Sequence, residues 1–247
     1  MIRYAKLNLA IDVKPLQEEI KRLNAEWLPH YQVKHYEGEW EVLALRAPGG
    51  NTQSPYAELR EGETFYDTEL MQHCPGIKKT LDLFKCEKLA VRLLNLKKDA
   101  VIKEHTDKDL CFEKGEVRMH IPVCTNPQVE FFVDNMQMKM REGECWYVNV
   151  NLPHRLGNQG DADRIHLVLD CSVNDWIKAL FNDPENEISI LTEAELWLRN
   201  KEEKLNIIHS LRLQNTETSL EMADSIENKL NGFIKESETK KNEGLIA

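Results

Sequence analysis

A histidine and an aspartate are separated by a single residue in the segment His105-Thr106-Asp107. If this segment is extended, the two side chains point to the same face, because side chains alternate along a β-strand. An imidazole and a carboxylate can then bind one metal ion. An Asp hydrogen-bonded to a surface His would produce the same pattern, so a metal site needs a further ligand from elsewhere in the chain.

His154 supplies a second imidazole, shortly after the apolar segment 144–150. Two imidazoles and one carboxylate on one side of a metal ion form the facial arrangement typical of non-haem Fe(II) enzymes. Three adjacent coordination positions stay open, two for a bidentate 2-oxo acid and one for O2. The sequence does not have the closed four-ligand set of structural zinc. We therefore predict that His105, Asp107 and His154 bind iron and are the catalytic residues.

Arg164 lies in the strand-like segment 164–171. A guanidinium inside a β core must be paired, because an unpaired buried charge is costly. Its planar fork binds carboxylates bidentately, so it suits the far end of a dicarboxylic cosubstrate whose other end is on the metal. The alternative is a salt bridge to Asp161, Asp163 or another surface carboxylate.

Arg118 and His120 are also separated by one residue, so a regular strand places them on one face. Near the metal they would add a second point of contact for a carboxylate. The alternative is a solvent-facing pair on a strand whose buried face carries Val117, Met119 and Ile121.

The elements that must position these residues are short strands separated by turns. Many short strands at a spacing of 8–12 residues indicate a β-sandwich or barrel with flanking helices. We expect strands at residues 4–11, 40–45, 89–96, 100–105, 119–124, 129–133, 136–140, 144–150 and 164–171, and helices at residues 15–27 and 76–83.

Past residue 175 the apolar spacing becomes helical, with helices expected at 193–213 and 220–234 and a frayed end at 235–247. We therefore divide the chain into a domain of residues 1–174 and a C-terminal helical extension of residues 175–247. This extension packs on the core, caps the barrel or forms a homodimer interface.

The composition narrows the classes of partner. The 247 residues carry a net charge of −10, which disfavours nucleic acid and anionic membrane as partners. There is no apolar run long enough for a transmembrane helix, and the first residues do not have the apolar segment of a signal peptide, so we expect a cytoplasmic protein. The six cysteines include no CxxC pair, which argues against a disulfide framework and a zinc knuckle.

Taken in order, the motifs resemble the aspartyl/asparaginyl β-hydroxylase family, which also contains bacterial free-proline hydroxylases. The resemblance covers residues 88–171, with a looser match at Trp40–Arg46. The matching segments are Ile102–Asp107, Arg118–Pro122, Gly143–Tyr147, Pro153-His154, Asn158 and Asp163–Leu167.

This resemblance implies a double-stranded β-helix core, also called a jelly-roll or cupin-like fold, that uses Fe(II), 2-oxoglutarate and O2. In it, His105 and His154 match the iron-binding histidines, and Arg164 matches the arginine that holds the distal carboxylate of 2-oxoglutarate. His120 matches a second 2-oxoglutarate contact, and Arg118 a residue near the substrate carboxylate. Asp107 is present as in the proline hydroxylases, whereas animal members of the family have a two-His iron site.

The resemblance implies a dioxygenase that hydroxylates an amino acid or an aminoacyl side chain, by Asp/Asn-type or proline hydroxylation, with succinate and CO2 as coproducts. The substrate would be a small amino acid or a peptide. The alternatives are a cupin-type metalloenzyme that does not use 2-oxoglutarate and a non-catalytic binding module.

Overall fold

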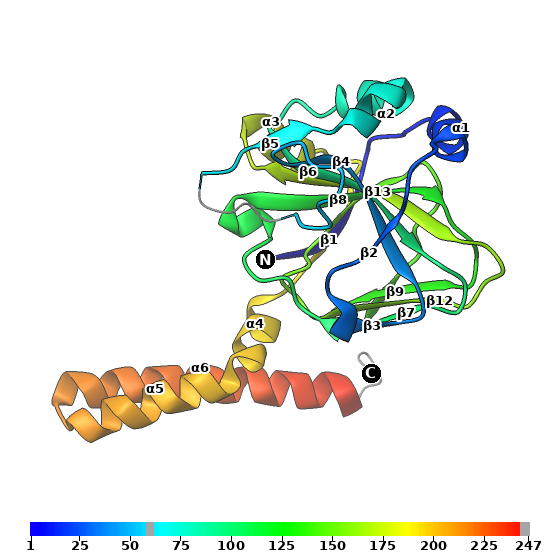
Figure 1. Cartoon of the computed structure of the whole chain (residues 1–247). Coiled ribbons are helices and arrows are strands. Elements are labelled where there is room, and N and C mark those ends of the chain that lie inside the picture. Colours follow the sequence, from blue (N-terminus) through cyan, green and yellow to red (C-terminus); the bar gives the residue numbers. More distant parts are fainter. Residues whose placement is uncertain (58–61, 243–247) are drawn as a thin grey trace. The chain divides into compact units, whose positions relative to one another are not determined.

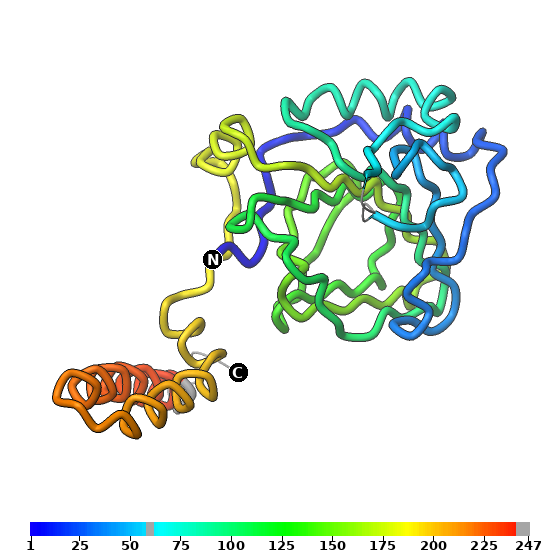
Figure 2. The backbone as a smooth tube through the Cα atoms, turned by 60° about the vertical axis from the view of Figure 1, so that its left-hand side comes forward, coloured from blue at the N-terminus to red at the C-terminus, as the bar shows by residue number. Residues whose placement is uncertain are grey.

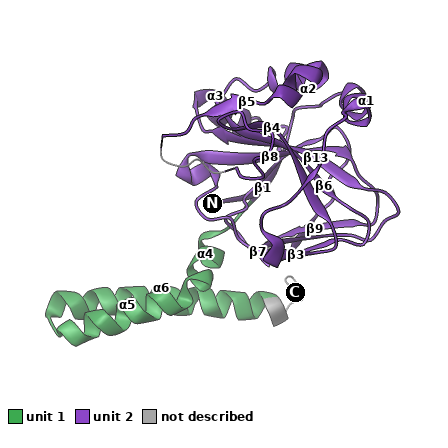
Figure 3. Ribbon diagram, viewed as in Figure 1, with its two compact units in different colours: residues 1, 190–247 green, residues 2–189 purple. Residues whose placement is uncertain are grey.

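The computed structural model describes residues 1–57 and 62–242 (Figure 1). It forms two compact units, residues 2–189 and residue 1 with residues 190–247 (Figure 3). The division falls later than the boundary expected after residue 174, because helix α3 (Asp175–Phe181) buries Ile177 and Phe181 in the core of the first unit. In the part of the chain that is described, no helix combines the length and apolarity needed to cross a bilayer.

Eight consecutive strands of the first unit are shared between two sheets (Figure 1). The larger sheet has the order β11-β8-β13-β6 at its centre, and the smaller sheet has β10-β9-β12-β7. The strands are β6 (Lys88–Leu96), β7 (Val101–His105), β8 (Glu116–Cys124), β9 (Val129–Val133), β10 (Met136–Met138), β11 (Cys145–Val148), β12 (His154–Asn158) and β13 (Arg164–Ser172).

This strand order is that of a double-stranded β-helix, which confirms the predicted mainly β, jelly-roll core. Figure 2 shows the strands as a ring around the interior of the unit. Every pairing of neighbouring strands in the two central sets is antiparallel.

Further strands extend both sheets, and helices cover the outer face of the larger one. The added strands are β1 (Ile2–Leu7), β2 (Leu28–Pro29), β4 (Trp40–Pro48), β5 (Phe65–Asp67) and β14 (Glu187–Ile190) in the larger sheet and β3 (Tyr36–Glu37) in the smaller. The short 3-10 helices are η1 (Val33–His35), η2 (Glu69–His73) and η3 (Phe112–Lys114). Helices α1 (Lys14–Arg22) and α2 (Pro75–Leu81) contribute Leu16 and Ile77 to an apolar core with Leu93, Met119 and Leu167 of the sheet.

The opposite face of the larger sheet points into the barrel and carries buried polar side chains among apolar ones. On β13, the core residues Ile165, Leu167 and Leu169 alternate with residues of the inner face, which are Arg164, His166, Val168 and Asp170. Arg164 and His120 both contact Phe131 of the smaller sheet, which places them inside the barrel. The fold therefore separates an apolar core outside the sheet from an interior that also holds buried charged and imidazole side chains.

Some elements differ from those expected. The helix expected at 15–27 ends at Arg22, because Leu23 has an extended backbone. Strand β12 was not predicted, since its short segment His-Arg-Leu-Gly-Asn is polar and contains a glycine. The helix expected at 193–213 is two helices, α4 (Glu193–Arg199) and α5 (Lys201–Gln214), which are separated at Asn200.

In the second unit, α5 and α6 (Glu217–Asn242) form a hairpin around Ile208, Ala223 and Leu230. Asn215 turns the chain between the helices with a positive φ of 51°. The fraying expected from residue 235 is wrong as far as residue 242, which is still helical, and residues 243–247 lie outside the described residues.

Candidate metal centre

Two neighbouring strands of the smaller sheet bring the two histidines together. His105 is the last residue of β7, His154 is the first residue of β12, and the two are direct partners in the antiparallel register. Their ring centroids are 4.2 Å apart. The backbone N–H of Asp107 donates to the carbonyl of Val150 at 2.8 Å, which holds the chain beyond β7 against the same site. Ligand atoms of His105, Asp107 and His154 all lie within 4.8 Å of one another.

Both imidazoles are oriented by backbone carbonyls. Nδ1 of His105 lies 2.8 Å from the carbonyl oxygen of Lys103, and Nδ1 of His154 lies 3.0 Å from that of Leu152. Since Nδ1–H donates to these carbonyls, each Nε2 keeps its lone pair for a metal ion. Burial, with the nearby His105, lowers the pKa of His154 to about 4, which keeps this imidazole neutral at neutral pH.

The carboxylate of Asp107 divides its two oxygens between the histidines and an arginine. Oδ1 lies 3.8 Å from Nε2 of His105, while Oδ2 accepts a hydrogen bond from Nη1 of Arg118 at 2.5 Å. Burial alone would raise the pKa of Asp107, but the charges of Arg118 and the imidazoles outweigh it and hold that pKa below its ordinary value. Asp107 is therefore anionic and presents one oxygen to the site.

Arg118 belongs to a buried network of four charges. Its Nε and Nη2 donate to the two oxygens of Asp170 at 2.6 and 2.9 Å, and Arg92 donates to Asp170 from the other side at 3.2 Å. Burial would lower the pKa of Arg118, but Asp170 and Asp107 raise it. Asp170 and Arg92 were not predicted as site residues from the sequence.

Arg164 is 2% exposed and has no carboxylate partner among the described residues. Its Nη2 lies 2.8 Å from Nδ1 of His166, and its Nε is buried without a hydrogen-bond partner in the part of the chain described. The alternative of a salt bridge is wrong, because Asp161 pairs with Lys98 and Asp163 with Lys97. Burial lowers the pKa of Arg164 to about 9, the mark of a desolvated charge without a counter-ion.

His120 is 5% exposed, and neither of its ring nitrogens has a hydrogen-bond partner among the described residues. Its ring centroid lies 5.7 Å from that of Phe131 and 5.8 Å from that of His166. Burial, followed by the charge of Arg164, holds the pKa of His120 well below its ordinary value. The alternative of a solvent-facing Arg118–His120 pair is therefore wrong.

Two cavities are lined by some of these residues, although neither described lining includes His105, His154 or His120. The first, which we call the metal-side cavity, has a volume of about 930 Å³ and is lined by Asp107, Arg118 and Asp170 together with His30 and Trp40. The rings of His30 and Trp40 are stacked at 3.5 Å.

The second, which we call the arginine-side cavity, has a volume of about 670 Å³ and is lined by Arg164, His166 and Phe131 together with Asn126 and Gln137. Both volumes fall in the range of pockets that bind small molecules, about 300–1,000 Å³.

Comparison with known proteins identifies the family of this chain. A model of the Aspartyl/Asparaginyl beta-hydroxylase family matches residues 12–173, a span that holds all six predicted site residues. An L-proline cis-4-hydroxylase of Rhizobium meliloti (strain 1021) is 21% identical over 154 residues, which cover 62% of this chain and 54% of the relative. The chain thus spans about half the length of this curated relative.

Solved structures to which the chain is similar include two from bacteria. An oxidoreductase of the 2OG-Fe(II) oxygenase family from Burkholderia pseudomallei is 14% identical, with a TM-score of 0.45, over 64% of this chain and 78% of that one. A Pseudomonas putida prolyl-4-hydroxylase is 12% identical, with a TM-score of 0.41, over 70% of this chain and 95% of that one.

Proposed function

Because this chain belongs to the aspartyl/asparaginyl β-hydroxylase family, we propose that it is an Fe(II)- and 2-oxoglutarate-dependent dioxygenase that hydroxylates an amino acid or an aminoacyl side chain. The observation that carries this proposal is the convergence of three ligand atoms, from His105, Asp107 and His154, within 4.8 Å of one another.

The donor set fits Fe(II). Two neutral imidazoles and one carboxylate suit a divalent iron and leave positions open for other ligands. His105 and His154 would bind through Nε2, because their Nδ1 atoms are engaged with backbone carbonyls. Asp107 would bind through Oδ1, since Oδ2 is held by Arg118.

Arg164 and His120 fit the distal carboxylate of 2-oxoglutarate. Arg164 is a buried guanidinium without a carboxylate partner among the described residues, and His120 has two ring nitrogens without partners there. A carboxylate beside Arg164 would remove the cost of its desolvated charge and make a charge-assisted hydrogen bond. The barrel interior therefore favours the binding of an anion beside Arg164.

When bound, Fe(II) with 2-oxoglutarate and O2 supplies the oxidative decarboxylation of 2-oxoglutarate to succinate and CO2, coupled to hydroxylation of a substrate C–H bond. The chain's own residues bind and orient the reactants. The network of Arg92, Asp170 and Arg118 holds Asp107 in one orientation.

The substrate would occupy the metal-side cavity, which is lined by Asp107 and by the stacked pair His30–Trp40. Arg118 lines the same cavity and would lie near a substrate carboxylate, as in the family. A free amino acid such as proline and a residue within a peptide are both candidates. A cytoplasmic location and a homodimer through the C-terminal helices stay predictions.

The test is succinate release from 2-oxoglutarate by the Fe(II)-loaded chain, measured across a panel of free amino acids and short peptides. We expect one class of substrate to stimulate succinate release above the rate without substrate. Iron binding without 2-oxoglutarate turnover would instead support a cupin-type enzyme of another reaction. A chain that binds neither iron nor 2-oxoglutarate would be a binding module.

A further inference from the structure

We propose that the barrel has two entrances, and that 2-oxoglutarate enters through the arginine-side cavity while the substrate enters through the metal-side cavity. This inference rests on the proposed function and adds a route that the function does not require. Among the residues that the structure describes, the linings of the two cavities share none. Of these two cavities, Asp107 lines the metal-side cavity and Arg164 lines the arginine-side cavity.

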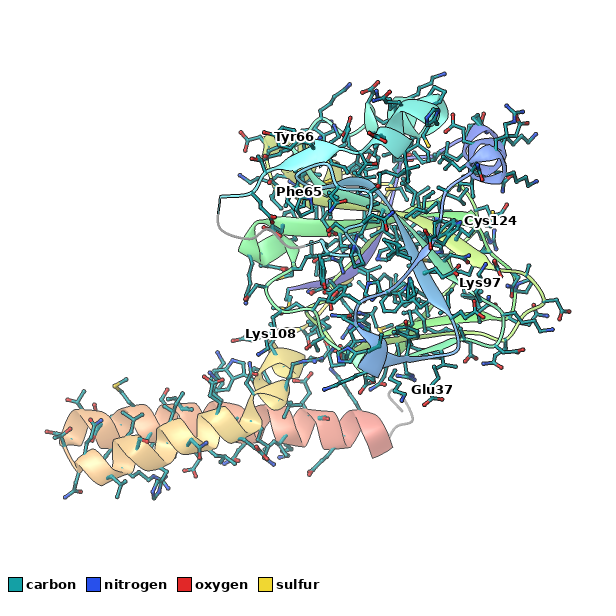
Figure 4. All side chains as sticks on the ribbon, viewed as in Figure 1. Glu37, Phe65, Tyr66, Lys97, Lys108 and Cys124 are labelled. Atoms are coloured by element: carbon teal, nitrogen blue, oxygen red, sulfur yellow. The ribbon has the colours of Figure 1, made fainter. Side chains whose placement is uncertain are left out.

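The two cavities open at different places on the first unit. The metal-side cavity is lined by Phe65 and by residues 106–110, whereas the arginine-side cavity is lined by residues 125–127, directly after β8, and by residues 137–142, after β9. In Figure 4, Phe65 and Lys108 lie on one side of the unit, and Cys124, the residue before Thr125, lies on the other. The two cavities therefore lie on different sides of the unit.

The two linings differ in charge, as expected if the anion 2-oxoglutarate enters through the arginine-side cavity. Among the described residues, the lining of the metal-side cavity carries four cations, Arg92, Lys108, Lys114 and Arg118, and four carboxylates, Asp107, Asp109, Glu116 and Asp170. The described lining of the arginine-side cavity carries three cations, Lys139, Arg141 and Arg164, and one carboxylate, Glu142. A cleft of one sign raises the association rate of an oppositely charged ligand. The dianion 2-oxoglutarate is therefore attracted to the arginine-side cavity.

The arginine-side cavity contains the residue proposed to bind the distal carboxylate of 2-oxoglutarate. Arg164 lines it, is 2% exposed, and has a buried Nε without a hydrogen-bond partner among the described residues. In contrast, Arg118 of the metal-side cavity is already bound by two carboxylates. A dicarboxylate entering from the arginine side meets an unpaired guanidinium, whereas one entering from the metal side meets arginines that are already paired.

Separate entrances have a kinetic consequence. If both molecules used one entrance, a bound substrate would block the entry of 2-oxoglutarate and binding would have a fixed order. With two entrances, 2-oxoglutarate associates at the same rate whether or not the metal-side cavity is filled.

The first experiment narrows each entrance in turn. Gln137 and Glu116 are exposed strand residues that line the arginine-side and the metal-side cavity respectively. The association rate of 2-oxoglutarate is measured by stopped-flow fluorescence on the full, Fe(II)-loaded chain without O2. We expect Gln137→Trp to lower this rate severalfold and Glu116→Trp to leave it unchanged. An equal effect of the two, or the reverse pattern, overturns the inference.

A second pair of variants changes charge instead of size. Arg141 and Lys114 are exposed cations that line the arginine-side and the metal-side cavity, and reversing either changes the net charge equally. Arg141→Glu should lower the association rate by about tenfold at low salt, with the difference shrinking as salt is added, and Lys114→Glu should not. Equal rates in both variants contradict the proposed route.

The outcomes separate this inference from the function on which it rests. If the wild-type chain retains Fe(II) but does not bind 2-oxoglutarate, the proposed function fails and the inference fails with it. Normal 2-oxoglutarate binding by the wild type, with no selective loss in Gln137→Trp or Arg141→Glu, overturns the two-entrance inference alone. Each variant is compared at equal iron content and equal melting temperature.

Discussion

The three arginines inside the barrel are distinguished by their partners. Arg92 and Arg118 share the carboxylate of Asp170, and Arg118 also binds Asp107. Arg164 is 2% exposed, has no carboxylate partner among the described residues, and contacts the imidazole of His166 and the ring of Phe131. A buried arginine with a carboxylate partner is typical of a structural role, whereas one without a counter-ion indicates a binding site for an anionic ligand.

This difference predicts an unusual result for Arg164→Met. Loss of a charge-assisted hydrogen bond worth about 2 kcal/mol should raise the Kd for 2-oxoglutarate by about thirtyfold. The melting temperature should not fall, because the substitution removes a desolvated charge and supplies an apolar side chain of similar length. Calorimetric titration of the Fe(II)-loaded chain and thermal unfolding measure the two effects.

Arg118→Met is the matched control, since it removes an arginine that is paired with two carboxylates. It should lower the melting temperature. If Arg164→Met lowered the melting temperature as much and kept its affinity for 2-oxoglutarate, Arg164 would be a structural residue.

At the scale of the element, β13 serves both faces of the larger sheet. Ile165, Leu167 and Leu169 pack in the helix-covered core, while Arg164 and Asp170 act inside the barrel. The same strand therefore links the predicted 2-oxoglutarate contact with the network that holds Asp107.

Much of this arrangement could be predicted from the sequence. Apart from β12, the barrel strands from 88 to 171 have clear alternation and turns, and residue types and spacing predicted the cluster of His105, Asp107 and His154 that the fold brings together. Arg92 was not predicted as a site residue. It also lies within an apolar strand, where a buried guanidinium must be paired, as was reasoned for Arg164.

Other features depend on tertiary register. Arg118 meets Asp107 eleven residues away and Asp170 fifty-two residues away, and no local pattern specifies those pairings. The register also explains why Arg164 has no carboxylate partner among the described residues. Asp161 and Asp163 are close to it in sequence, but in the fold they pair with lysines, Lys98 and Lys97.

The network predicts that Asp170→Asn is strongly destabilising. The substitution leaves Arg92 without a charged partner in a buried site, and breaking a buried ion pair in this way costs about 3 kcal/mol or more. Urea unfolding should show the loss. Asp161→Asn, which removes an exposed ion pair with Lys98, should leave the free energy of unfolding nearly unchanged. If both variants changed the free energy of unfolding by a similarly small amount, the buried ion pairs of Asp170 would not stabilise the fold as expected.

On the scale of the whole molecule, the fold buries several imidazoles in their neutral form. Burial holds the pKa values of His120 and His166 well below 6.5, and burial with the charge of Arg92 lowers that of His30 to about 2. Below pH 6.5 the unfolded chain therefore binds protons that the folded chain does not. The free energy of unfolding must fall as the pH drops from about 6.5 toward 2.

His30→Phe tests one of these contributions, since phenylalanine can keep the stacking on Trp40. The slope of the unfolding free energy against pH, between about pH 6 and 4, should decrease by up to about 1.4 kcal/mol per pH unit. His209→Phe is the control, because His209 is exposed on α5. A slope in His30→Phe that matches the wild type would mean that His30 is protonated in the folded chain.

The central claim is that His105, Asp107 and His154 bind one Fe(II) ion, and iron retention measures it most directly. The wild-type chain, titrated with Fe(II) without O2, should bind one equivalent. His105→Ala and His154→Ala should each lose both iron and succinate release, while His209→Ala should keep both. A His154→Ala variant with full iron content and full activity would contradict the assignment.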